Sequence, residues 1–107
     1  RILGRASIDI IKSGGYKLSA LEIEGVLLTH EAIHEVAVVG EADETWGEVV
    51  VAYLVCEAGR EPGEEALRDW CLERMSRYKV PRRFEYLTTL PRNAMGKVTK
   101  SALGKRG

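Results

Sequence analysis

Two valine-rich runs in the middle of the chain constrain its fold more than any other feature. They are His34 to Val39 and Val49 to Cys56, and each is closed by a glycine or by the loop 57–63, which contains glycine and proline. Runs of β-branched residues bounded in this way are typical of buried strands. The sequence therefore predicts two core strands, which the remaining segments must cover.

A β-hairpin is predicted before these strands. Ile8 to Lys12 has the composition of a short strand and Tyr16 to Leu18 that of a returning strand, with Gly14 and Gly15 between them. Paired glycines supply the positive φ angles that a two-residue hairpin turn requires. We therefore expect the chain to reverse its direction at the two glycines.

Helical patterns follow the hairpin and the second core strand. Ser19 and Glu22 have the spacing of a capping box, and apolar residues at helical spacing continue to about Thr29. Glu64 to Tyr78 carries apolar side chains three and four residues apart, as in a helix with one buried face. Thr99 is placed to cap a short final helix.

Together these elements indicate an α+β fold. Arg83 to Leu87 follows Pro81 and is predicted to form a third strand of the sheet. Because strands and helices interleave irregularly, we expect a small domain with a β-hairpin and a three-stranded sheet packed against about three helices. The length of 107 residues suits one domain, and no repeat or linker divides the chain.

Composition excludes several classes of protein. With 45% hydrophobic and 30% charged residues, the chain is not expected to be disordered. No apolar run is long enough to span a membrane and the first residues have no signal-peptide pattern, so we expect a cytoplasmic protein, or one of the mitochondrial matrix. Sixteen basic residues balance sixteen acidic ones, which argues against a nucleic-acid-binding protein.

The balanced total hides an uneven distribution of charge. Residues 1–66 hold 5 basic and 13 acidic side chains, whereas residues 67–107 hold 11 basic and 3 acidic ones. An anionic partner, such as a phosphate compound, is therefore expected at the C-terminal third.

No metal site is expected. Cys56 and Cys71 have no CxxC spacing and lie in apolar stretches, which favours buried, reduced thiols. His30 and His34 straddle the predicted end of a helix, and we interpret them as surface or packing histidines.

Lys97 is the strongest single candidate for a functional side chain. It follows a glycine in a loop that begins near Pro91, and a flexible ammonium on such a loop can be delivered to a phosphate or a carboxylate. The alternative is a solvated lysine in a basic tail that includes Lys100, Lys105 and Arg106.

The two turns that contain glycine also allow two interpretations. At Gly14 and Gly15 a ligand chain can pass close to bare backbone, but a plain hairpin turn has the same pattern, and the glycine loop of a KH domain is a weaker match. In the turn Asp43 to Glu48, Trp46 is predicted to cover one end of the sheet rather than to stack on a ligand.

A series of motifs runs in order from Gly4 to about Leu103. It consists of Gly4-Arg5, Asp9-Ile10-Ile11-Lys12-Ser13-Gly14-Gly15-Tyr16-Lys17, Glu22-Ile23-Glu24, Val36-Ala37-Val38-Val39-Gly40, Asp43, Trp46-Gly47-Glu48, Tyr78-Lys79-Val80-Pro81 and Leu90-Pro91-Arg92-Asn93-Ala94-Met95-Gly96-Lys97-Val98. As an ordered set, these motifs resemble the C-terminal domain of adenylate-forming acyl-CoA synthetases, and most of all the malonyl-CoA or methylmalonyl-CoA synthetase branch.

The resemblance implies a two-step reaction. A carboxylate attacks ATP, bound with Mg²⁺, to give an acyl-adenylate and pyrophosphate, and the thiol of CoA then displaces AMP. It also implies that Lys97 reaches the carboxylate and the α-phosphate in the first step, with Arg5 near the nucleotide. In the second step, the resemblance implies a CoA channel lined by Ser13, Gly14, Gly15, Tyr16 and Lys17.

The resemblance also implies a division of the enzyme into domains. Residues 1–12 hold the hinge region and the first strand, and residues 4–107 form the mobile C-terminal domain. Its partner is the enzyme's own N-terminal domain, which holds most of the site for ATP and Mg²⁺. The family has an acidic hinge residue two positions after the arginine; this chain has Ser7 there, and Asp9 is the other candidate for the hinge.

Two other functions remain open at this point. The chain can belong to the adenylation domain of a peptide synthetase, whose acceptor is the pantetheine of a carrier protein. It can also be a binding module in which the basic third binds an anion without catalysis.

Overall fold

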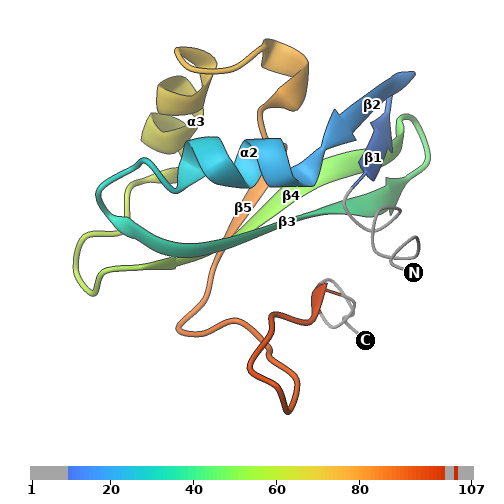
Figure 1. Ribbon diagram of the computed structural model, residues 1–107. Coiled ribbons are helices and arrows are strands. Elements are labelled where there is room, and N and C mark those ends of the chain that lie inside the picture. The colour runs from blue at the N-terminus through green and yellow to red at the C-terminus, as the bar shows by residue number, and fades with distance from the viewer. Residues whose placement is uncertain (1–9, 101–102, 104–107) are drawn as a thin grey trace.

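The structure, a computed structural model, describes residues 10–100 and Leu103. The elements are β1 (Ile10–Ser13), β2 (Tyr16–Ser19), α2 (Ala20–Leu27), β3 (Ile33–Asp43), β4 (Gly47–Cys56), α3 (Glu64–Leu72), a 3₁₀ turn (Arg77–Lys79) and β5 (Arg83–Tyr86). This is a small α+β domain, as the sequence predicted (Figure 1).

The hairpin and the other strands form a single five-stranded sheet. Its order is β2-β1-β4-β3, and β5 pairs in parallel with β4. β1 meets β4 only where Ser13 lies opposite Gly47, whereas β5 pairs with residues 51–54. The hairpin and β5 therefore share one side of β4, while β3 lies along the other side and forms an edge of the sheet.

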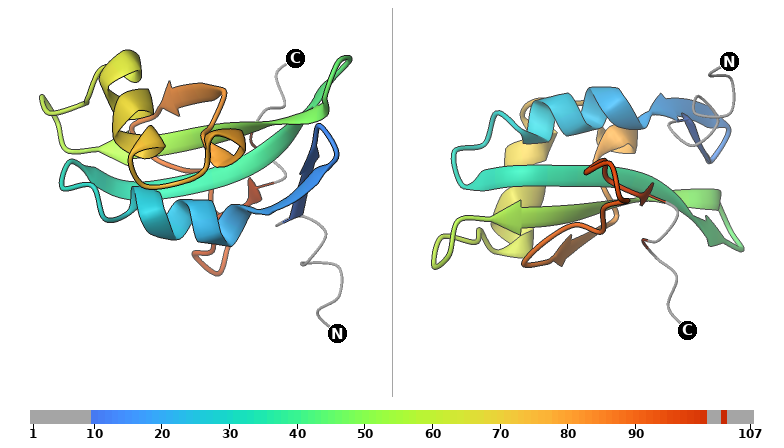
Figure 2. Two further views of the ribbon diagram at one scale, coloured as in Figure 1. Left: turned by 90° about the horizontal axis from the view of Figure 1, so that it is seen from above. Right: turned by 60° about the horizontal axis from the view of Figure 1, so that its bottom comes forward.

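Different segments of the chain pack on the two faces of the sheet. In β4, Val50, Ala52 and Leu54 pack into the core beneath the helices, whereas Val51 and Tyr53 belong to a second cluster with Leu90. This alternation is the period of two expected of a strand buried on both faces. Helices α2 and α3 cover one face and the segment after β5 covers the other (Figures 1 and 2).

Helix α2 begins as predicted but is shorter. The N–H of Glu22 donates to Ser19 Oγ at 3.2 Å, which is the N-cap expected from the capping-box pattern. The helix ends at Leu27 instead of Thr29, because the N–H and the hydroxyl of Thr29 both donate to the carbonyl of Val26 and close a turn.

The second predicted helix, Glu64 to Tyr78, is wrong in its C-terminal half. Helix α3 ends at Leu72, and the chain continues through turns into the 3₁₀ turn. Pro81 disfavours the α conformation at Val80, which is extended with φ −70° and ψ 129°. The helix is already interrupted before this point, because Ser76 is extended with φ −63° and ψ 147°, and Tyr78 stacks on Tyr16 of the hairpin.

Some predictions lie outside the described residues. These are the start of the first strand at Ile8, the roles of Arg5, Ser7 and Asp9, and most of the final helix after Thr99. Within the described ranges, no helix is long and apolar enough to cross a membrane.

Candidate functional site

Both glycines of the hairpin turn adopt positive φ, at 57° for Gly14 and 90° for Gly15. These values fit a two-residue type I′ turn, which confirms the predicted hairpin. The N–H of Gly14 donates to the carbonyl of Trp46 at 3.0 Å, and a Cβ on Gly14 would lie 2.8 Å from the Trp46 ring. A Cβ on Gly15 would meet no atom within 4 Å, so the backbone there faces open space.

Trp46 is held in the turn between β3 and β4. The carboxylate of Asp43 accepts hydrogen bonds from the N–H groups of Thr45 at 3.0 Å and Trp46 at 2.9 Å, and Gly47 adopts a φ of 82°. The indole is 42% exposed and packs against the hairpin tip. Trp46 therefore packs over the hairpin tip at one end of the sheet, but the expectation that it is a core residue is wrong, because its ring remains exposed.

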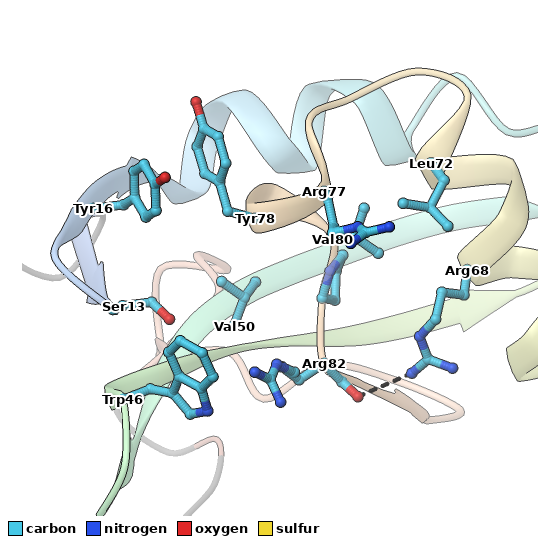
Figure 3. A pocket seen from close by; sticks show the side chains of 12 residues that line it. Ser13, Tyr16, Trp46, Val50, Arg68, Leu72, Arg77, Tyr78, Val80 and Arg82 are labelled. Atoms are coloured by element: carbon cyan, nitrogen blue, oxygen red, sulfur yellow. Dashed lines mark hydrogen bonds between the residues drawn. The ribbon is translucent and has the colours of Figure 1, made fainter.

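A groove of about 680 Å³ lies between the hairpin, the 3₁₀ turn and α3. Near the hairpin the rings of Tyr16 and Tyr78 are stacked, with centroids 4.0 Å apart and planes 5° apart. The Trp46 ring lies on the same side of the groove, and the guanidinium of Arg82 lies 4.8 Å from its centre (Figure 3). The groove thus combines flat aromatic surfaces with positive charge.

Two further arginines line this groove, and they differ in their contacts. Arg68 donates to the carbonyl of Arg82 at 3.0 Å and pairs with Glu64 at 3.4 Å, so its guanidinium is already occupied (Figure 3). The guanidinium of Arg77 has no hydrogen-bond or ion-pair partner in the part of the chain that the structure describes, although its backbone carbonyl accepts from the N–H of Val80. Arg77 and Arg82 are therefore the cations that the groove offers to an anion.

Within the described part of the C-terminal third, four other basic residues pair with acidic residues of the N-terminal half. Ion pairs of this kind join Lys79 to Glu22, Arg83 to Glu41, Arg92 to Glu35 and Lys100 to Glu24. Among residues 10–100, the cations without an acidic partner are Lys12 and Lys17 on the hairpin, Arg77 and Arg82 in the groove, and Lys97. Among these residues, unpaired positive charge thus lies on the hairpin, in the groove beside it and at the Lys97 loop.

Lys97 lies in an ordered loop whose backbone is organised by Asn93. Asn93 Oδ1 accepts hydrogen bonds from the N–H of Met95 at 2.9 Å and of Lys97 at 3.1 Å, and the Asn93 N–H donates to the Lys97 carbonyl at 2.9 Å. Gly96 provides the required positive φ of 84°. The main chain at Lys97 is fixed, while its side chain is exposed and has no partner among the described residues.

The loop and the groove lie on opposite faces of the sheet. Val98, next to Lys97, packs with Leu90 against the cluster beneath the sheet, whereas the groove has Val50, from the helix face, in its wall. Figures 1 and 2 show the same separation of the C-terminal segment from the hairpin and helices. One rigid domain cannot present both to the same point at once.

Comparison with known families gives a match to the AMP-binding enzyme C-terminal domain over residues 22–97. The chain belongs to this family. It is 46% identical over 102 residues to the mitochondrial malonate–CoA ligase of Bos taurus. The matched residues make up 95% of this chain and 17% of that protein. The resemblance inferred from the motifs is confirmed.

Two solved structures support the same assignment. The o-succinylbenzoate CoA synthetase of Bacillus subtilis in complex with its acyl-adenylate intermediate gives a TM-score of 0.83 at 40% identity, over 92% of this chain and 20% of that one. ATP-bound MatB from Rhodopseudomonas palustris gives a TM-score of 0.87 at 29% identity, over 91% of this chain and 19% of that one. The chain thus spans about a fifth of the length of these relatives.

The structure brings together only some of the site residues predicted for an AMP-binding enzyme C-terminal domain. Ser13, Gly14 and Tyr16 line the groove, Gly15 and Lys17 lie beside them on the hairpin, and Lys97 lies apart on the other face. The sequence analysis missed Tyr78, Arg77 and Arg82 as groove residues. The basic and aromatic cluster around Pro81 was the signal that could have indicated them.

Possible metal ligands and two buried titratable side chains, Cys71 and Tyr53, lie outside the groove. Among the described residues, no group of three or more histidine, cysteine or acidic side chains could hold a metal ion. Burial raises the pKa of the Cys71 thiol to about 11. Burial, followed by the hydrogen bond to Glu41, raises the pKa of Tyr53 to about 12, so both groups stay protonated near neutral pH.

Proposed function

We propose that the chain is the small C-terminal domain of an AMP-forming carboxylate–CoA ligase. Such an enzyme joins a carboxylate to ATP with release of pyrophosphate, and then transfers the acyl group from the adenylate to the thiol of CoA with release of AMP. The names of the relatives support a CoA ligase, and their length supports a larger partner domain. Malonate is the first acid to test, because it is the substrate named for the Bos taurus relative.

Lys97 acts in the first step. Negative charge accumulates where a carboxylate approaches the α-phosphate of ATP, and a preorganised ammonium lowers the energy of that arrangement. The fixed main chain at Lys97 and its exposed, unpaired side chain suit a group that is delivered to a site on another domain. The described residues offer no cluster for Mg²⁺, so we assign the metal to the ATP phosphates and the larger domain.

The groove and the hairpin act in the second step, on CoA. Trp46, Tyr16 and Tyr78 offer flat surfaces for an adenine ring, and Arg77 and Arg82 offer positive charge for the phosphates of its nucleotide end. The pantetheine arm then passes over Gly15, where nothing obstructs the backbone.

The observation that carries this proposal is the separation of the two sites onto opposite faces of one sheet. If each face serves one half-reaction, the domain must turn relative to its partner between the two steps. The segment before β1, which includes Ser7 and Asp9, is where we place the hinge.

CoA is favoured over the alternative acceptor, a carrier protein of a peptide synthetase. The pantetheine of a carrier protein lacks the adenine and the 3′-phosphate of CoA, so an aromatic groove with two unpaired arginines would have no ligand there. The cytoplasm or the mitochondrial matrix remains our prediction for the location, and the Bos taurus relative is a mitochondrial enzyme.

The test is a product analysis of the complete enzyme that carries this chain. With ATP, Mg²⁺, malonate and CoA, we expect AMP, pyrophosphate and a CoA thioester in equal amounts, and no thioester from the 107-residue chain alone. Formation of ADP, or turnover by the isolated chain, would contradict the proposal. Loading of a carrier protein without use of CoA would establish the alternative acceptor.

A further inference from the structure

A largely buried ion pair, with both side chains still partly exposed, joins the Lys97 loop to the opposite side of the sheet. Lys100 Nζ lies 2.8 Å from Glu24 Oε2, and both side chains are only 14% exposed. The same carboxylate oxygen accepts the N–H of Val38 at 2.8 Å. Glu24 belongs to α2, Val38 to the edge strand β3, and Lys100 follows Lys97 by three residues.

The pair connects three parts of the domain across an open edge of the sheet. Helix α2 covers one face and the Lys97 loop packs on the other, so Lys100 must reach around β3 to meet Glu24. Because water reaches only a small part of the Glu24 carboxylate, loss of its partners would leave its charge poorly compensated. The pair therefore fixes the end of the loop more firmly than an exposed pair would.

The loop is a narrow hairpin, so fixing its last residues also fixes Lys97. Arg92 and Val98 form a β-bridge across it, and the N–H of Thr99 donates to the carbonyl of Pro91 at 2.8 Å. The first arm of the loop is held by a more exposed ion pair, that of Arg92 with Glu35, whose side chains are 39% and 40% exposed.

We propose that the Glu24–Lys100 ion pair is a positioning device for Lys97 in adenylate formation. Glu24 and Lys100 touch no substrate; they hold the loop in the one arrangement that brings the Lys97 ammonium to the reacting phosphate. The proposal rests on the function assigned to Lys97 above. A displacement of about 1 Å at a reacting group can cost up to two orders of magnitude in rate.

Two substitutions in the complete enzyme test this role. Glu24→Gln keeps an oxygen for the Val38 N–H but removes the charge, and Lys100→Met keeps the aliphatic stem. Each should reduce pyrophosphate exchange with ATP about tenfold, on the scale of a partial misplacement, and leave thioester formation from pre-made acyl-adenylate within about twofold. Lys100→Arg, which retains the charge, should recover most of the exchange activity.

A matched control separates this effect from a general loss of stability. Arg60→Met breaks exposed ion pairs to Glu57 and Glu31, at 3.6 and 3.5 Å, far from the loop in the sequence, and should leave both half-reactions unchanged. All rates are compared well below the melting temperature of each variant. If Glu24→Gln and Lys100→Met lower both half-reactions in parallel, the pair is only structural and the proposal is overturned.

The decisive comparison uses the Lys97→Ala background. If Glu24 and Lys100 act through Lys97, their substitution should cause no further loss of exchange once Lys97 is absent. A further tenfold loss in that background would overturn the positioning role while leaving the function of Lys97 intact. If Lys97→Ala alone leaves exchange unchanged, the function assigned to Lys97 fails, and the positioning role fails with it.

Discussion

Gly14 and Gly15 are glycines for two different physical reasons. Gly14 has a positive φ and lies so close to Trp46 that a Cβ would meet the ring at 2.8 Å. Gly15 also has a positive φ, but the space beyond it is empty. The first position is therefore constrained by the fold itself, whereas the second is the one at which a side chain would reveal a passing ligand.

We expect Gly15→Leu to impair the CoA-dependent step while pyrophosphate exchange persists. Gly15→Ala is the matched control, because alanine incurs the same backbone strain at φ 90° and lacks the bulk. The comparison measures kcat/KM for CoA, together with the melting temperature, in both variants. Equal losses in the two variants, in step with the melting temperature, would mean that the glycine serves only the turn.

The two cysteines should differ in reactivity. Burial raises the pKa of both thiols, to about 11 for Cys71, and Cys71 is fully buried whereas Cys56 is partly exposed. Because the thiolate is the reactive form and needs access to the reagent, iodoacetamide at pH 8 should modify Cys56 before Cys71 in the native protein. Mass spectrometry of the digested protein checks this order, and faster modification of Cys71 would contradict the buried position.

Single residues also show what the sequence could and could not indicate. Lys97 stood out as a candidate, because it follows a glycine in a loop that begins near Pro91, but the pattern also fitted a solvated lysine in a basic tail, and only the resemblance gave it a role. Trp46 was misinterpreted, because whether an aromatic side chain beside a strand faces the core depends on the conformation of its turn. Arg77 and Arg82 are distinguished from their neighbours only by lacking an acidic partner, which depends on contacts between distant segments.

At the scale of elements, the 3₁₀ turn and the residues that follow it supply the groove with Tyr78, Arg77 and Arg82. The sequence assigned this region to a continuous helix. On such a helix Tyr78 would not stack on Tyr16, and the groove would not exist. The strands and α2 were predictable because local patterns define them, whereas the apolar spacing continues past Leu72 and does not show that Ser76 is extended.

We expect Arg82→Gln and Arg77→Gln each to raise the KM for CoA about tenfold, since hydrogen bonds to charged groups contribute on the order of 1.5–3 kcal/mol. The KM for ATP should be unchanged. Arg74→Gln is the control, because Arg74 stacks on Trp70 at 4.2 Å and does not line the groove. An equal rise in the KM for CoA in the Arg74 variant would show that the groove does not bind CoA.

At the scale of the whole molecule, the charge asymmetry of the sequence has a structural meaning. The acidic N-terminal half and the basic C-terminal third pair across α2 and β3, as in the contacts of Lys79 with Glu22 and of Lys100 with Glu24. The sequence indicated that an anion belongs at the basic third. It could not indicate that basic side chains without acidic partners remain at two separate places, the groove and Lys97, or that the sheet lies between them.

The most direct test of the account compares both half-reactions in the Lys97→Ala variant of the complete enzyme. Because Lys97 and the CoA groove lie on opposite faces of the sheet, removal of its charge should affect only the step in which that face meets ATP. We expect pyrophosphate exchange to fall by about 10²-fold or more, while pre-made acyl-adenylate is converted to the CoA thioester at nearly the original rate. A parallel loss of both half-reactions would contradict the assignment of one face to each step.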